Sequence, residues 1–301
     1  MRRDSGVVLI NALVIVLTIS VLAAALLTRS ERARLRASYA QGAQQSELYL
    51  DGVERLVPDL LKEVVKDTLS HTGQAWAQKG RSYPIDRGQV AVRVVDLQGR
   101  LNVNWLMRGG DFVDGVFERV FTELRLPLTL LDEITGFVIA GGPKGVADYM
   151  SRTPPVFPRG GPLRAVDELR EVRGMTPEYF AILAPVVSAL PVETRLNLNT
   201  APKMVVEAML QPLPDELRAE LLASSAPIVA IGNIRKRAME LLETEEIEYL
   251  QLQRMTVGSN WFRADLAASL EGAVQRRAVV FQILMGEKVT IDAVYRWAVY
   301  D

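Results

Sequence analysis

The chain has 301 residues, of which 49% are hydrophobic and 24% charged, a composition that suits two folded domains or one elaborated domain. Its 35 Lys and Arg residues nearly balance its 36 Asp and Glu residues, which argues against a general polyanion binder. The sequence has no cysteine, and its one histidine is His71. The composition therefore excludes disulfide scaffolds, cysteine nucleophiles and histidine-rich metal sites. It favours a structural or binding role over catalysis.

The strongest signal lies near the N-terminus, where residues 7–28 carry no charged side chain. As a helix this stretch is about 33 Å long, enough to cross the hydrocarbon layer of a membrane. A soluble core helix rarely runs so far without a polar face. The sequence therefore predicts a membrane span.

Three kinds of span fit the stretch. A secretory signal peptide could be cleaved near Ala23–Ala25, but the apolar run continues through Leu27 and strong helix formers follow. An ordinary signal anchor would remain uncleaved. The third kind starts from the short basic leader of residues 1–6, which ends in Gly6 directly before the apolar run.

This junction resembles the leader of prepilins, which prepilin peptidase cuts after the glycine. The resemblance implies cleavage between Gly6 and Val7 and N-methylation of Val7. Position five of the mature chain is then Asn11. Most pilins and pseudopilins carry a glutamate there, thought to neutralise the amine of a neighbouring subunit, and an amide has no charge for that role. The K-type minor pseudopilin of type II secretion also lacks the glutamate.

Beyond the span, the spacing predicts a helix to about residue 70. Apolar residues such as Leu50, Val57 and Val64 recur three or four positions apart and form one stripe. Pro58 lies inside this pattern and should bend the helix or begin a second segment.

Alternating apolar residues predict strands at both ends of the rest of the chain. The first covers residues 89–96, and a second begins at 101–104 after a turn. Residues 277–284 and 289–299 should form an antiparallel hairpin through a turn at 286–288. Between these strand regions the pattern is helical, which indicates a helical domain inserted into a sheet. The candidate helices are 113–124, 165–172, 176–187, 201–210, 214–223 and 234–242.

A short motif occurs twice, as Arg100–Asn104 and as Arg195–Asn199, both reading Arg-Leu-Asn-apolar-Asn. Such asparagines are expected to hold turns and caps rather than to take part in catalysis. In the second copy, Asn199 or Thr200 should cap the helix that follows Pro202.

Three further segments, together with the leader and span, carry a resemblance over nearly the whole chain. They are DLQGRLNVN at 96–104, DELREVRGM at 167–175 and the run at 190–202 that ends in LNLNTAP. In this order they resemble the K-type minor pseudopilins of type II secretion. The resemblance implies an α+β fold in which a long N-terminal helix packs on an antiparallel pilin-like sheet, with a large all-helical, SAM-like insertion. It divides the chain into a leader (1–6), the membrane part of the helix (7–28), a helix with the first strands (29–110), the insertion (111–257) and the last strands (258–301).

The resemblance also implies a function without catalysis. The chain would be a single-pass protein of the bacterial inner membrane with a periplasmic domain, placed at the tip of a pseudopilus that supports export of folded proteins across the outer membrane. Prepilin peptidase and the I- and J-type pseudopilins would be its partners. The alternative is a membrane-anchored helix-hairpin-helix protein that binds nucleic acid through residues 168–177, where the usual second glycine is missing. A membrane-anchored hydrolase has no recognisable nucleophile motif to support it.

Some K-type proteins bind calcium at an acidic cluster before a Gly-x-x-Asp-Tyr element. This chain keeps the element, with Asp148, but residues 135–140 upstream contain no carboxylate. Calcium needs about six to eight oxygen ligands. Asp148 is thus a weak calcium candidate, and the expectation is that no cofactor is bound.

Overall fold

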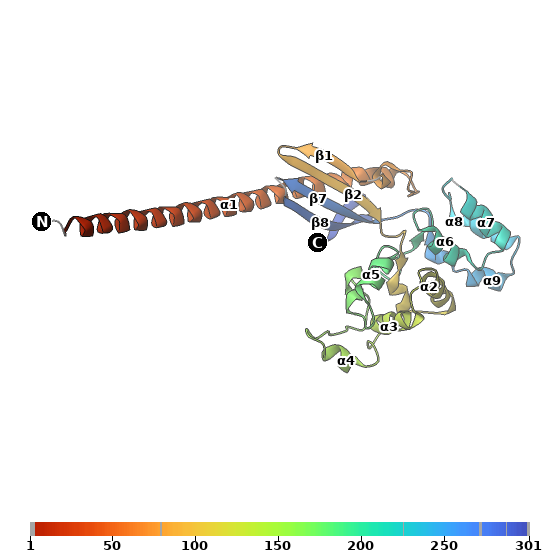
Figure 1. Ribbon diagram of the computed structural model, residues 1–301. Coiled ribbons are helices and arrows are strands. Elements are labelled where there is room, and N and C mark those ends of the chain that lie inside the picture. The colour runs from red at the N-terminus through yellow and green to blue at the C-terminus, as the bar shows by residue number, and fades with distance from the viewer. Residues whose placement is uncertain (1–3, 79, 225, 271–272, 287, 300–301) are drawn as a thin grey trace.

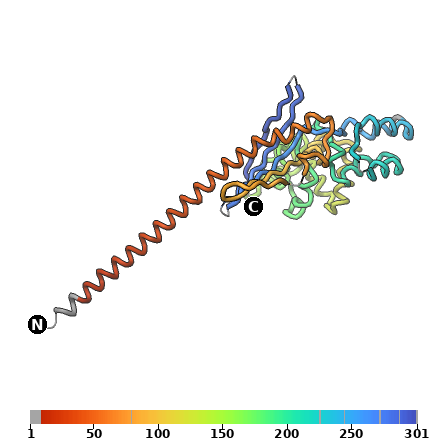
Figure 2. The backbone as a smooth tube through the Cα atoms, turned by 90° about the horizontal axis from the view of Figure 1, so that it is seen from above, coloured from red at the N-terminus to blue at the C-terminus, as the bar shows by residue number. Residues whose placement is uncertain are grey.

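The computed structural model describes residues 4–78, 80–224, 226–270, 273–286 and 288–299, and for residues 4–8 and 244 it describes the backbone only. Its first element, α1 (Asp4–Lys66), is one helix of 63 residues, about 95 Å long. Figure 1 shows the N-terminal part of α1 as a rod that projects from the molecule, while its C-terminal part lies against a sheet. The view from above in Figure 2 shows the same rod leading away from every other element.

Pro58 starts no second segment, contrary to one of the two expectations, because α1 continues through it to Lys66. The loss of one backbone hydrogen bond at a proline weakens a helix. Here the helix is buried on both sides of that position, at Leu50 and Val57 before it and at Leu61 after it. Tertiary packing of this stripe offsets the local cost.

The five-stranded sheet is antiparallel throughout, with strand order β1-β2-β7-β8-β9. Its strands are β1 (Arg81–Ile85), β2 (Gly88–Asp96), β7 (Trp261–Leu270), β8 (Ala273–Leu284) and β9 (Thr290–Ala298). The expected strands at 89–96, 277–284 and 289–299 are confirmed as parts of β2, β8 and β9. The expected hairpin between the last two is confirmed as well.

One face of the sheet packs against the C-terminal part of α1. In β2, Val90, Val92 and Val94 point to this face, and β7 contributes Phe262 and Leu266. The indole of Trp76, in the short 3-10 helix η1 (Ala75–Ala77), closes one end of this core with its ring 5.0 Å from that of Phe262. Burial of each such side chain stabilises the fold by roughly 1.5–3 kcal/mol, so the helix stays on the sheet.

The chain between β2 and β7 forms a second, mainly helical body with its own core. Its longer helices are α2 (Asp111–Glu123), α3 (Leu128–Val138), α5 (Pro177–Leu183), α6 (Lys203–Leu210), α7 (Asp215–Ala223), α8 (Ile231–Met239) and α9 (Thr244–Tyr249). The short α4 (Val146–Met150) and three 3-10 helices complete it, η2 (Val103–Met107), η3 (Val166–Glu171) and η4 (Leu252–Arg254). Figure 1 shows this insert at the end of the molecule opposite the projecting rod.

Two pairs of short parallel strands lie within the insert. β3 (Leu101–Asn102) pairs with β4 (Val187–Ser188), and β5 (Leu196–Asn197) pairs with β6 (Met255–Thr256). The architecture expected from the sequence, a long helix on an antiparallel sheet with an inserted helical region, is thus confirmed.

Several details expected from the sequence are wrong. The strand expected to begin at 101–104 is present only as β3, and it pairs with β4 rather than with the main sheet. It ends at Asn102, whose side chain accepts a hydrogen bond from the Asn104 N–H and caps η2. The helix expected at 176–187 ends at Leu183, since Val187 joins β4. The helix expected at 165–172 is the 3-10 helix η3.

Candidate assembly surface

The projecting part of α1 is uncovered, and its stretch up to residue 28 is apolar. Every residue from 9 to 41 is exposed, and an 18-residue window in this part has a mean hydropathy of 2.6. The exposed fraction reaches 71% at Leu27. Among the described residues, α1 is the one helix that is long and apolar enough to cross a membrane. An apolar surface of this size is stable only when lipid or other helices cover it.

The hydroxyl groups in the uncharged stretch 7–28 are satisfied within the helix. Thr18 donates to the carbonyl of Val14 at 2.9 Å, and Ser20 and Thr28 donate in the same way over 2.8 Å. Such backbone bonding lets a polar side chain enter an apolar medium. Asn11 differs, because its amide is exposed and no other described residue accepts or donates a bond to it. The predicted position-five residue therefore presents an unpaired polar group in an apolar stretch.

Gly6 and Val7, at the predicted cleavage point, lie in the first turns of α1, where only the backbone is described. Residues 1–3 of the leader lie outside the described residues. Cleavage between Gly6 and Val7 stays a prediction.

An ion-pair cluster with two buried members, Glu54 and Arg277, fixes the C-terminal part of α1 to the sheet. Arg277 of β8 reaches Asp51 at 2.6 Å and Glu54 at 2.8 Å on α1, and it also pairs with Glu47. Glu54 pairs in addition with Arg296 of β9. The side chains of Glu54 and Arg277 are only 8% and 10% exposed. This cluster sets both the height and the rotation of α1 on the sheet.

The charges of the cluster shift the titration of its members. Hydrogen bonding to Arg277 lowers the pKa of the Asp51 carboxyl. Burial would raise the pKa of Glu54, but its hydrogen bonds to Arg296 and Arg277 outweigh that effect and lower it. Both acids are therefore more easily ionised here than in an unfolded chain. The spacing of Glu47, Asp51 and Glu54 on one helix face is the sequence signal that could have revealed the cluster.

A polar network joins the sheet to the insert at Asp96, the last residue of β2. Its Oδ2 accepts hydrogen bonds from the hydroxyls of Ser259 and Thr200, both at 2.6 Å, and from the Asn197 amide at 3.2 Å. Its Oδ1 accepts from the N–H of Gln98 at 2.8 Å. Burial raises the pKa of Asp96, and these hydrogen bonds oppose the shift only in part.

The two copies of the Arg-Leu-Asn-apolar-Asn motif perform the same task. The first asparagine of each copy accepts a bond from the N–H of the second, over 3.2 Å at Asn102 and 3.0 Å at Asn197. The second asparagine then clamps a distant backbone segment from both sides, Asn104 at Leu163 and Asn199 at Ile228. The structural role expected for these asparagines is confirmed.

The capping expected in the second copy is wrong. The residue before α6 is Pro202, and no side chain caps that helix. The hydroxyl of Thr200 donates to Asp96 instead. The Thr200 hydroxyl is therefore part of the hydrogen-bond network at Asp96 and does not cap α6.

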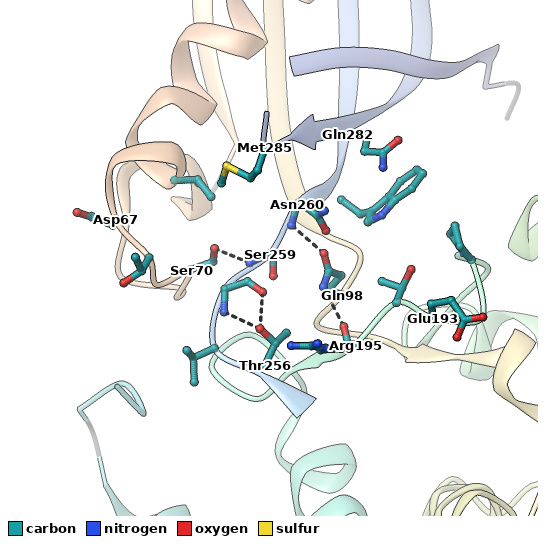
Figure 3. Close-up of a pocket in the computed structure, with 17 residues that line it drawn as sticks. Asp67, Ser70, Gln98, Glu193, Arg195, Thr256, Ser259, Asn260, Gln282 and Met285 are labelled. Atoms are coloured by element: carbon teal, nitrogen blue, oxygen red, sulfur yellow. Dashed lines mark hydrogen bonds between the residues drawn. The ribbon is translucent and has the colours of Figure 1, made fainter. Parts of the chain in front are cut away.

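A polar cleft of about 520 Å³ lies beside this junction, between the end of α1, the insert and β7. Figure 3 shows Ser70, Gln98, Ser259 and Asn260 facing one another across it. The Ser70 hydroxyl accepts from the Ser259 N–H at 2.9 Å, and the Gln98 side chain accepts from the Asn260 N–H at 2.7 Å and donates to the carbonyl of Arg195 at 2.9 Å. These groups satisfy one another's hydrogen-bonding capacity, and the bonds across the cleft hold the sheet and the insert together.

The calcium candidate Asp148 is engaged by an arginine. Its Oδ2 lies 2.9 Å from the Arg173 guanidinium, which also pairs with Glu133 of α3. Across the described residues, no three acidic, histidine or cysteine side chains gather closely enough to hold a metal ion. The residues around Asp148 do not fit the ligand set that calcium requires.

The comparisons with known proteins agree with one another. A family model described as type II secretion system (T2SS), protein K, matches residues 99–192. The type II secretion system protein K of Pseudomonas aeruginosa is 30% identical over 236 residues, covering 71% of each chain. The protein of the same name from Klebsiella pneumoniae is 30% identical over 220 residues, covering 66% of this chain and 67% of the relative. That of Pectobacterium carotovorum subsp. carotovorum is 24% identical over 314 residues, covering 96% and 95%.

The fold is similar to that of a solved structure. A chain in the crystal structure of the GspK-GspI-GspJ complex from the enterotoxigenic Escherichia coli type 2 secretion system matches with a TM-score of 0.74 at 20% identity, covering 88% of this chain and 100% of that one. With relatives at 30% identity over two thirds of their length, this chain belongs to the type II secretion system protein K family.

Proposed function

We propose that this chain, a minor pseudopilin of type II secretion, caps the tip of a periplasmic pseudopilus. The observation that carries the proposal is the position of the insert. It lies at the end of the molecule opposite the projecting rod, where the next subunit of a filament would have to stack (Figure 1). Because the insert would block the stacking of a further subunit, this chain fits the terminal position of a filament.

Asn11 supports the same position. A glutamate at the fifth mature residue would serve a subunit added beyond this one, whereas a tip subunit has no such neighbour. The Asn11 amide still needs a partner in an apolar surrounding, and the neighbouring helices below the tip can supply one.

The rod would hold the protein in the bacterial inner membrane as a single-pass anchor, with the sheet and the insert as separate domains in the periplasm. Prepilin peptidase would remove residues 1–6 after Gly6, and Val7 would be methylated. The I- and J-type pseudopilins would pack against the exposed face of α1. The printed description of the solved GspK-GspI-GspJ complex supports these partners. Catalysis and a resident calcium ion form no part of this role.

Site-directed cross-linking tests the proposal, since the chain has no cysteine of its own. Leu13→Cys places a thiol on the exposed rod, and Met239→Cys places a matched control on the exposed surface of the insert. In cells that also produce cysteine variants of the I- and J-type pseudopilins, Leu13→Cys should form cross-links to these partners and Met239→Cys should form none. Cross-linked dimers of this chain through Leu13→Cys would contradict the tip position, because they would place two copies side by side in the filament.

A further inference from the structure

The face of the sheet that α1 leaves uncovered forms a groove against the insert. The groove has a volume of about 820 Å³, within the range of about 300–1,000 Å³ typical of binding pockets. Trp261, Val280 and Trp297 belong to one cluster on the sheet side. Leu163 and Leu190 line the wall formed by the insert.

The sheet side of the groove is apolar and partly open. Trp261 and Val280 are buried, and Trp297 packs against them. Tyr295, two residues before Trp297 in β9, also lines the groove and is 47% exposed. The accessible part of this surface, Tyr295 with the half-buried Trp297, favours contact with apolar side chains of a partner.

The groove has an excess of positive charge, because five arginines line it and Asp167 is the acidic residue among its lining residues. Three of these arginines are paired with acids of this chain. Arg159 lies 2.5 Å from Glu168, Arg263 lies 2.9 Å from Asp265, and Arg296 pairs with Glu54. The other two are Arg100 and Arg164, and in the part of the chain that the structure describes no carboxylate lies within ion-pair distance of either guanidinium.

Arg100 is the more constrained of the two. Its side chain has a single long hydrogen bond, to the carbonyl of Ala184 at 3.4 Å. Burial, followed by the charge of nearby Arg263, lowers its pKa to about 10. Desolvation of a cation is costly, and the charges of Asp265 and Asp96 offset that cost only in part. A carboxylate placed in the groove would stabilise the Arg100 guanidinium further through a charge-assisted hydrogen bond.

We infer that this groove binds an extended acidic segment of a partner protein. Aliphatic or aromatic side chains of the segment pack on Tyr295 and Trp297, which lie over the buried Trp261 and Val280, and its carboxylates pair with Arg100 and Arg164. A small anion would leave the apolar surface unused. Lipid headgroups are disfavoured because the insert wall of the groove lies at the end opposite the membrane rod (Figure 1). The inference goes beyond the proposed tip role and does not depend on it.

A peptide titration tests this inference on the full chain in dodecylmaltoside micelles. The probe is a fluorescein-labelled octapeptide in which glutamate alternates with leucine, and its control carries glutamine in place of every glutamate. Fluorescence anisotropy should show saturable binding of the acidic peptide and at least about tenfold weaker binding of the glutamine peptide, because each charge-assisted pair contributes about one decade or more in affinity.

Variants locate the binding site. Arg164→Gln, at an exposed position, should weaken binding of the acidic peptide about tenfold. Arg108→Gln is the matched control, since Arg108 is an exposed arginine of the insert outside the groove and should leave binding unchanged. Gly161→Trp adds bulk at a groove position whose Cβ would meet open space, so the fold should tolerate it while binding is lost.

Four results would overturn the inference. Equal binding of the acidic and glutamine peptides would remove the role of the carboxylates. Equal weakening by Arg164→Gln and Arg108→Gln would show a diffuse charge effect. Self-association of the full chain that Arg164→Gln abolishes, or binding to vesicles of anionic phosphatidylglycerol that Gly161→Trp abolishes, would assign the groove to a second copy or to lipid.

Discussion

Replacement of Arg277 by methionine removes the centre of the cluster that holds α1 on the sheet. The change leaves Glu47, Asp51 and Glu54 facing an apolar side chain of similar length. The largest loss comes from Glu54, which is buried and retains only Arg296. Leaving a buried charge without its partner costs about 3–5 kcal/mol, and the remaining arginine places Arg277→Met at the lower end, about 3 kcal/mol.

The two other carboxylates change this magnitude little. Glu47 and Asp51 are half exposed, with 55% and 51% of the side chain open to solvent. Pairs of this kind contribute about 0–1 kcal/mol each. Arg277→Met should therefore lower the free energy of unfolding by about 3–4 kcal/mol in total. The loss should be concentrated in the sheet and in the C-terminal part of α1.

Hydrogen exchange of the full chain in detergent micelles, read by mass spectrometry, measures this loss in each segment. It suits a protein with two cores, for which a single unfolding transition cannot be assumed. Protection should fall in β8 and in α1 from residue 46 onward, while α2 and α6 in the insert keep theirs. Lys62→Met is the control, because it removes an exposed cation of α1 paired with Asp59 and should cost less than about 0.5 kcal/mol.

A double variant separates charge from packing. Adding Glu54→Met to Arg277→Met removes the stranded buried carboxylate, so it should restore part of the lost stability. Arg277→Met costing no more than Lys62→Met would refute the reasoning. A Glu54→Met change that destabilises the Arg277→Met protein further would do so as well, since the charge would then not be the cause.

Three further predictions concern the other sites. Folding lowers the pKa values of Asp51 and Glu54. The contribution of these carboxylates to stability is therefore complete above about pH 4.5 and is lost as the pH falls through their folded pKa values. In this pH window the stability of Arg277→Met should depend less on pH than that of the unaltered protein. Asn197→Ala should lower hydrogen-exchange protection at the junction by about 3 kcal/mol because it strips buried partners there, whereas a loss below about 1 kcal/mol would contradict that role. Calcium at millimolar concentration should leave Tm unchanged, since Arg173 holds the Asp148 carboxylate; a rise in Tm that Asp148→Asn abolishes would reveal a calcium site.

The elements with strong periodicity could be predicted from the sequence. Val90, Val92 and Val94 alternate as a half-buried strand must, and the uncharged run at 7–28 has the length of a membrane span. β7 shows no strand pattern in the sequence, because Ala264, Ala267 and Ala268 favour a helix and only the neighbouring strands override that preference.

The functional surfaces were less predictable, because they depend on partners far apart in the chain. Asp96 meets residues about a hundred positions later, and Arg277 meets α1 more than two hundred positions earlier. The repeated asparagine motif showed that two sites were alike, but not that each clamps a distant backbone segment. The groove could not be predicted at all, since its two walls come together only through the packing of the insert on the sheet.

The central claim is that the rod is a retained assembly stem rather than a cleaved export signal. Intact-mass and N-terminal peptide spectrometry of the protein recovered from membranes, after production with a prepilin peptidase, tests it most directly. The account predicts a chain that begins at N-methylated Val7, and a Gly6→Asp variant that keeps its leader. A mature chain that begins at Leu26 or beyond would contradict it, because the rod would then be absent from the working protein.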